Sequence, residues 1–406
     1  PRAAPVPDPT IEAAADSEAF ADSEAVVGSE VAADPDALAD SVGEQASGLG
    51  TLPPALGDEA DDTEVPRPSL GATPSFEARA AIEADPLDVN AWRRLLDAMS
   101  AGTSGASAAW LGGVVAWVEG EVRPATPSVP VGPLPEAMRR PLLPSSVPTN
   151  LLLLLRAVGP SIAPAFGGGG RGRNADQAED FVPEQSTLHA MARRLAAAID
   201  VPAFRLLRNA ARPYTVTVEP EVPATLVLGT AIVDGADDTG RSFLLARCLV
   251  PMREGTLPAR KLSDREFRAF LGALLGLLGA DYPVRPRDRA TADRLRSQLQ
   301  PLVEDHRRPE WDALARAAAS GLGTFSPAAV RAGLETYAAR LALALSDGFG
   351  GAFEMLRLLD FDDRPRESLS REDLEQFLAD SEVARDLLIF AGSPACLAVR
   401  TWLAGR

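Results

Sequence analysis

Apolar residues recur at every third or fourth position through most of residues 186–406, and this spacing predicts amphipathic helices. The first of these helices starts with Ser186, a typical N-cap residue, and has Leu188 and Ile199 on one apolar face. Further helices are expected at 243–255, 265–279, 328–345, 351–361, 370–378 and 382–403. The helix at 243–255, "FLLARCLVPMREG", is apolar on nearly every side, so we expect it to be buried.

Three short runs between the first two helices have the composition of strands. They are "AFRLL" (203–207), "YTVTVE" (214–219) and "ATLVLG" (224–229), and 231–242 should form the turn that follows. Helices outnumber these strands. The sequence therefore predicts a predominantly α, α+β fold in which helices wrap a small mixed sheet.

Residues 75–100 predict a helical hairpin. Phe76 and Ile82 mark the first apolar face, Pro86 ends that helix, and Trp92 and Leu95 mark the second face. This hairpin resembles a tetratricopeptide-repeat junction, with Ala108 at the position of the small helix-packing residue. The resemblance implies a protein-binding surface, which we expect within 75–118, with Arg93 and Asp97 exposed.

The remaining segments have the composition of linkers. Residues 121–185 are rich in Pro and Gly and read as a connector with one short helix at 149–166, capped by Thr149 or Asn150. Residues 1–74 read as a disordered acidic tail, because this stretch has too little apolar surface to form a core. Residues 1–64 hold sixteen Asp/Glu and one Arg, so the remainder of the chain carries only −2 of the net charge of −17. That distribution disfavours nucleic acid as a partner.

The order of helix, strands and buried helix resembles that of HtpX-like zinc metallopeptidases. The resemblance implies that the buried helix should carry H-E-x-x-H, in which two histidines bind zinc and the Glu activates water. Arg247, Cys248 and Pro251 stand at the first ligand, the base and the second ligand. The stretches "VPATLVLGTAIVDG" and "DLLIFAGSPACLAVRTWLAGR" also resemble the C-terminal region of tetratricopeptide-repeat proteins of myxobacteria and related deltaproteobacteria. An inactive peptidase is therefore expected.

Other reactive side chains are few. The chain has two histidines, His189 and His306, and neither has a partner at catalytic or ligand spacing. Cys248 and Cys396 lie in apolar runs and are expected to be buried free thiols in a reducing compartment. We therefore expect no catalytic residue, no cofactor and no metal ligand. No apolar run reaches the eighteen residues of a membrane span.

The sequence thus predicts four parts: 1–74, the tail; 75–120, tetratricopeptide-like helices; 121–185, the connector; and 186–406, a mixed domain resembling an inactive metallopeptidase. The favoured function is a cytoplasmic, non-catalytic scaffold that binds protein partners. The alternative is a hydrolase of divergent, non-zinc mechanism that uses the peptidase-like cleft.

Overall fold

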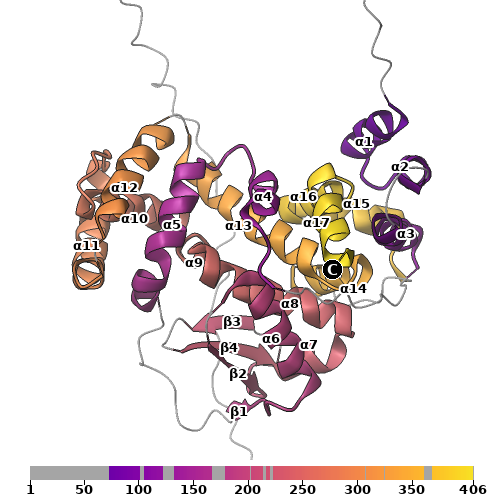
Figure 1. The fold of residues 1–406 in the computed structure, drawn as a ribbon, viewed down its shortest axis with the longest axis horizontal. Helices are drawn as coiled ribbons and strands as arrows, with labels where there is room; N and C mark the ends of the chain where they lie inside the picture. The colour runs from indigo at the N-terminus through magenta and orange to yellow at the C-terminus, as the bar shows by residue number, and fades with distance from the viewer. Residues whose placement is uncertain are drawn as a thin grey trace, which may run out of the picture. The chain divides into compact units, whose positions relative to one another are not determined.

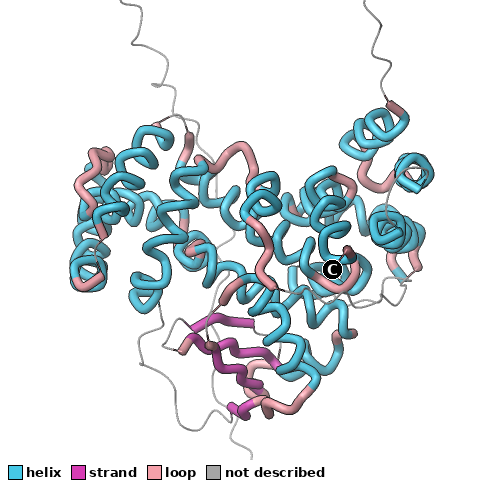
Figure 2. Tube along the Cα trace, viewed as in Figure 1, coloured by secondary structure: helices cyan, strands magenta, loops and turns pink. Residues whose placement is uncertain are grey.

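Helices form most of the described chain and accompany one four-stranded sheet (Figures 1 and 2). The computed structural model describes residues 73–100, 105–121, 132–166, 179–201, 203–213, 216–219, 223–306, 308–323, 325–360 and 368–405. These residues belong to one compact unit that begins at Ser69. The predicted fold class, α+β with mostly helix, is confirmed. The predicted acidic tail lies outside the described residues, apart from residues 73 and 74.

The sheet has the order β1-β2-β4-β3, with β1 (Glu179–Phe181), β2 (Phe204–Asn209), β3 (Val216–Glu219) and β4 (Ala224–Gly229). The central strands β2 and β4 run parallel, and each outer strand is antiparallel to its neighbour. The three predicted strands are present. β1 was not predicted because "EDF" is short and has no alternation of apolar and polar residues.

Three helices lie next to the sheet: α6 (Thr187–Ile199), α7 (Thr230–Gly235) and α8 (Asp238–Glu254). The Ser186 hydroxyl caps α6 by accepting from the His189 amide at 3.1 Å, as predicted. The stretch 231–242 is not a turn, and that prediction was wrong. The Asp237 carboxylate accepts from the Gly240 amide at 2.7 Å, so one capping side chain starts α8 inside a sequence rich in Gly and Asp.

Helix α8 is central to the core, as expected. It packs against α5, α6, α13 and α14, and its residues from Phe243 to Ala246 and from Cys248 to Pro251 are buried. Gly255 ends the helix with φ +67°. A Cβ atom there would lie 1.9 Å from the Leu155 carbonyl oxygen, so only glycine allows α5 to approach this closely.

The repeat-like segment comprises α1 (Pro74–Ala84), α2 (Val89–Ser100) and α3 (Gly105–Glu119). Trp92 is fully buried, and its indole N–H donates to the Pro86 carbonyl at 2.8 Å. Helix α3 packs against α14 and α17, and the Trp117 ring meets the Phe353 ring with centroids 4.5 Å apart. The C-terminal helices therefore cover much of the apolar surface that a repeat fragment leaves open.

The other helices complete the core. They are α4 (Glu136–Arg139), η2 (Arg140–Leu142), α5 (Thr149–Ile162), η3 (Ala163–Phe166), α9 (Leu257–Lys261), α10 (Asp264–Leu277), η4 (Pro286–Asp288), α11 (Arg289–Glu304), α12 (Pro309–Leu322), α13 (Pro327–Leu345), α14 (Phe349–Asp360), α15 (Arg371–Asp380), α16 (Glu382–Ala391) and α17 (Pro394–Ala404). Pro148, not Thr149 or Asn150, is the N-cap of α5, and no side chain caps it. The predicted helix at 382–403 is two helices, because Ser393 caps a new one before Pro394.

One stretch in the described part of the chain, Thr149–Phe166, is long and apolar enough to cross a membrane, and the bent pair α16 and α17 passes the same test together. In this structure α5 packs against α12 and α8, with Leu151, Leu154 and Leu155 fully buried.

Candidate functional site

The middle of α8 carries the positions at which the resemblance to zinc peptidases places the metal ligands. Arg247 and Pro251 are one turn apart, and both line a cavity of about 200 Å³ that we call the Arg247 cavity. Its full lining is Arg247, Pro251, Thr256, Arg260, Glu335, Ala338, Ala339 and Val383. The spacing expected of two zinc ligands on one helical face is therefore present. The side chains are wrong for zinc, because arginine stays protonated and proline has no side-chain donor atom.

Pro251 changes the hydrogen bonding of α8. Because proline has no backbone N–H, the carbonyl four positions earlier, that of Arg247, lacks its usual helical donor. The Arg260 guanidinium on α9 donates to this carbonyl, with Nη1 3.1 Å from the oxygen. The proline at the second ligand position is thus compensated by a bond between α8 and α9.

A carboxylate from another helix reaches the same cavity. Glu335 of α13 lines the cavity and accepts from Arg331 Nη1 at 2.6 Å. Burial raises the pKa of Glu335, while the nearby charges of Arg331, Arg260 and Arg247 oppose that rise. Some catalytic zinc sites take two histidines from one helix and a carboxylate from elsewhere. Glu335 is the one described lining residue of the Arg247 cavity that belongs to such a ligand set. The guanidinium groups beside it are positively charged.

The donor set in this part of the molecule does not fit a metal. Among the described residues, no group of three or more His, Cys, Asp or Glu side chains is placed to hold a metal ion. What the cavity does contain is a hydroxyl without a partner. Thr256 is only 2% exposed, and its Oγ1 atom has no hydrogen-bond partner.

The predicted thiols and histidines are not brought together. Cys248 and Cys396 are both fully buried, as expected; burial raises the pKa of Cys248, and it raises that of Cys396 to about 12. His306 is exposed and lies two residues after the end of α11. His189 is half-buried and stacks on Phe204, with ring centroids 5.9 Å apart. None of these four side chains lines the Arg247 cavity, so none of them supplies a nucleophile or a base there.

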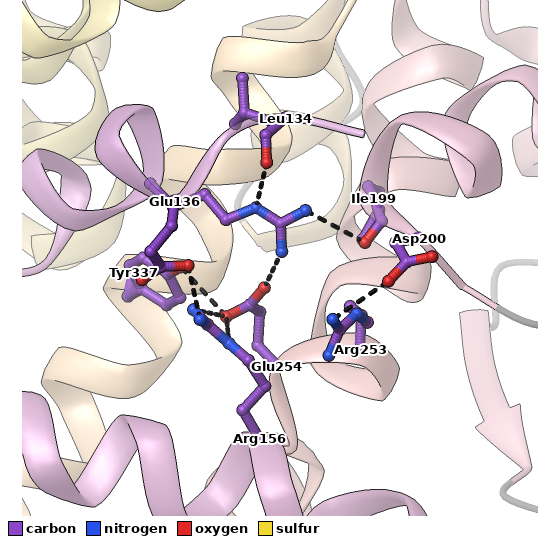
Figure 3. A network of polar contacts seen from close by, with 9 residues as sticks. Leu134, Glu136, Arg156, Ile199, Asp200, Arg253, Glu254 and Tyr337 are labelled. Atoms are coloured by element: carbon purple, nitrogen blue, oxygen red, sulfur yellow. Dashed lines mark hydrogen bonds and ion pairs between the residues drawn. The ribbon is translucent and has the colours of Figure 1, made fainter. Parts of the chain in front are cut away.

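The last turn of α8 holds a polar cluster that the sequence analysis missed. Glu254 is fully buried and accepts from Arg139 Nη1 at 2.8 Å, from Arg156 Nη2 at 2.6 Å and from the Tyr337 hydroxyl at 3.1 Å (Figure 3). Arg139 also donates to the Leu134 and Ile199 carbonyls, at 2.9 and 3.3 Å. We call this the Glu254 cluster; it ties α4, α5, α8 and α13 together. The sequence contains a signal for it, because a glutamate in the last turn opposes the helix dipole and needs a cationic partner.

Two partners of Glu254, Arg156 and Tyr337, have shifted pKa values. Burial lowers the pKa of Arg156, but the charge of Glu254 and its hydrogen bond outweigh burial and raise that pKa overall. Burial, the charge of Glu254 and their hydrogen bond together raise the pKa of Tyr337, so this phenol stays protonated and acts as a donor. A closed arrangement of this kind has no open side for a substrate.

A groove lies on the repeat-like segment. It has a volume of about 610 Å³, and its lining comes from α2, α3, α15 and the loops beside them. Leu87, Val89 and Leu374 contribute apolar surface. Arg93 and Glu119 form an ion pair of 2.5 Å at its edge. We call it the α2–α3–α15 groove.

A third cavity has a volume of about 500 Å³ and shares one lining residue, Pro251, with the Arg247 cavity. Its lining is mainly apolar and comes from α5, η3, α8, α9 and the starts of β2 and β4. Among the described residues that line this third cavity, Arg253 is the one with a charge. Its guanidinium pairs with Asp200 at 3.1 Å.

No protein-family model matches this chain, and neither a curated protein nor a solved structure does. The resemblances to tetratricopeptide repeats and to zinc peptidases therefore stay predictions. Function has to be argued from the geometry of these sites.

Proposed function

We propose that this chain is a non-catalytic protein-interaction protein and that its partner binds along the α2–α3–α15 groove. The observation that carries the proposal is the groove itself, which combines an apolar floor with charged residues at the edge. This composition is typical of surfaces that bind other proteins. The exposed side chain of Arg93, predicted to lie on the binding surface, lines it.

The Arg247 cavity supports the non-catalytic part of the proposal. Arg247 and Pro251 cannot replace two histidine ligands, and a buried Cys248 with a raised pKa cannot act as a base on metal-bound water. The position therefore lacks the side chains of a zinc peptidase. The compensating bond from Arg260 to the Arg247 carbonyl indicates that the local packing is adapted to the proline.

Site-specific photocrosslinking in lysate of the source organism tests the proposal. A photoreactive residue replaces Arg93, which lines the groove, or Asp97, which is exposed one turn along α2 and does not line it. We expect one protein partner to crosslink from position 93 and much less from position 97. Val89→Glu places a charge on the apolar floor and should abolish that product, whereas Asp97→Asn should not.

The competing hydrolase function predicts a different result. If Arg247→Ala or Glu335→Gln protein stays folded and loses a measured substrate-dependent hydrolysis, while Val89→Glu retains it, the scaffold proposal is wrong. Equal crosslinking from positions 93 and 97 also contradicts the proposed groove.

A further inference from the structure

We propose that the Arg247 cavity binds a small oxyanion, a carboxylate or phosphate group, in the space between α8, α9 and α13. This inference is independent of the proposed groove, because the groove and the Arg247 cavity share none of the described residues that line them. It rests on charge, on an unpartnered hydroxyl and on size.

The charges around the cavity favour an anion. Arg247 and Arg260 both line it. The carboxylate that also lines it, Glu335, is bound by Arg331 at 2.6 Å. Arg331 also pairs with Asp264 at 2.5 Å. Two guanidinium groups therefore line the cavity, and the carboxylate among its described lining residues is already paired with a third arginine. Guanidinium groups are the side chains best suited to bind carboxylate and phosphate oxygens.

Thr256 supplies the second observation. Its side chain is at the start of α9, lines the cavity and is almost fully buried, yet its Oγ1 atom has no hydrogen-bond partner. A buried hydroxyl without a partner is unfavourable, and most such groups in folded proteins are satisfied. An oxyanion in the cavity would accept from this hydroxyl and from the guanidinium groups beside it.

The size of the cavity limits the ligand. Its volume is about 200 Å³. That is the space of roughly six or seven water molecules, at about 30 Å³ for each. Acetate, a short dicarboxylate or inorganic phosphate fits, whereas a nucleotide or a folded peptide does not. Ala338, Ala339 and Val383 form the apolar part of the wall and leave room for a few carbon atoms.

The test uses the whole chain and two probes, sodium phosphate and sodium acetate, each compared with sodium chloride at the same ionic strength. The readouts are the midpoint of thermal unfolding and the dissociation constant from titration calorimetry. We expect at least one of the two anions to bind saturably with one site per chain. The stronger probe identifies whether phosphate or carboxylate is the preferred group.

Thr256→Val is the decisive variant. It removes a hydroxyl that has no partner in the free protein, so the unfolding midpoint without anion should stay the same or rise, while anion affinity falls about tenfold. Thr225→Val is the matched control, because Thr225 is also fully buried with an unpartnered hydroxyl but does not line the cavity. It should leave anion affinity unchanged.

A second pair of variants tests the charge. Arg260→Met should weaken binding by tenfold or more, since it removes a charged donor. Arg294→Met removes an exposed arginine on α11 and should have no effect beyond ionic strength. The proposal is overturned if neither anion binds more strongly than chloride, or if Thr256→Val and Thr225→Val change the affinity equally.

Discussion

Two clusters of arginine and glutamate lie two turns apart at the C-terminal end of α8, and they differ in how completely their polar atoms are paired. In the Glu254 cluster the carboxylate accepts from two guanidinium groups and a phenol, and it has no exposure to solvent. The Arg247 cavity has empty space, a half-buried glutamate and a buried hydroxyl without a partner. Arginine and glutamate are therefore completely paired in the Glu254 cluster, whereas the Arg247 cavity contains the same residue types beside unfilled space and an unpartnered hydroxyl.

A polar cluster that stabilises the fold differs from a ligand-binding site in whether its buried polar atoms are all paired. A carboxylate that is completely satisfied by the protein holds helices together and has no capacity left for a ligand. A cavity whose wall holds a buried hydroxyl without a partner has that capacity. Substitutions at the two places should therefore differ in their effects on stability and on ligand binding.

Glu254→Ala should destabilise the protein more than any other change at this end of α8. It leaves Arg139, whose side chain is only 5% exposed, without its carboxylate partner, and Arg156 keeps only its exposed partner Glu136. Breaking a buried ion pair by removing one partner typically costs about 3–5 kcal/mol. Urea denaturation followed by circular dichroism measures the change.

Glu136→Ala is the matched control for that variant. Glu136 pairs with the same Arg156 at 2.6 Å, but its side chain is 56% exposed. An exposed pair is worth about 0–1 kcal/mol, so this loss should be small. If the two variants lower the free energy of unfolding equally, the Glu254 cluster does not stabilise the packing of α4, α5, α8 and α13.

Cys248 lies on α8 one residue after Arg247, and its thiol should be unreactive in the folded protein. Because it is fully buried and burial raises its pKa, the thiolate that attacks Ellman's reagent is scarce and enclosed. Cys396 should behave in the same way. We expect both thiols to react only after denaturation.

A new cysteine at an exposed position provides the reference for this measurement. Ser100→Cys, at the exposed end of α2, should react at once in the folded protein. Rapid labelling of wild-type protein before unfolding would show that Cys248 is accessible and would reopen the question of a nucleophile at this place.

Much of the fold could be predicted from the sequence because local patterns determine it. The apolar spacing of α8, the strands β2 to β4 and the Ser186 cap were all expected, and each depends on residues close together in the chain. The helix at 230–235 was missed because Gly and Asp residues usually mark turns. The position of Arg247 and Pro251 on one face was also expected, since residues four apart share a helical face.

The site could be predicted only in part, because its remaining side chains come from distant segments. Glu335 is 88 residues after Arg247 in the chain, and nothing local to α13 indicates that this glutamate reaches the cavity. Arg260 and Thr256 are nearer in sequence, but their role depends on how α9 packs on α8. Only the tertiary structure supplies that information.

Two glutamates, Glu335 and Glu266, should differ slightly in how they make stability depend on pH. Burial raises the pKa of Glu335 above its usual value of 4.5, so the native state holds this proton more tightly than the unfolded state does. Stability must then fall as pH rises from about 4.5 through the higher native pKa. Glu335→Gln removes the titrating group, and its stability relative to wild type should improve across that window.

Glu266 should show the opposite sign. Its carboxylate accepts from the Ser263 hydroxyl at 2.9 Å in the capping box of α10, and those hydrogen bonds from Ser263 lower the pKa of Glu266. The contribution of Glu266 to stability is present above pH 4.5 and is lost as pH falls through its lower native pKa. Compared with wild type, Glu266→Gln should therefore become less stable as pH rises from that native pKa to about 4.5. Chemical denaturation of both variants between about pH 3 and 7 gives the two slopes. If the two plots of stability against pH have slopes of the same sign, Glu335 is not held in a partly buried cavity wall. The Arg247 cavity would then not differ in this respect from an exposed capping carboxylate.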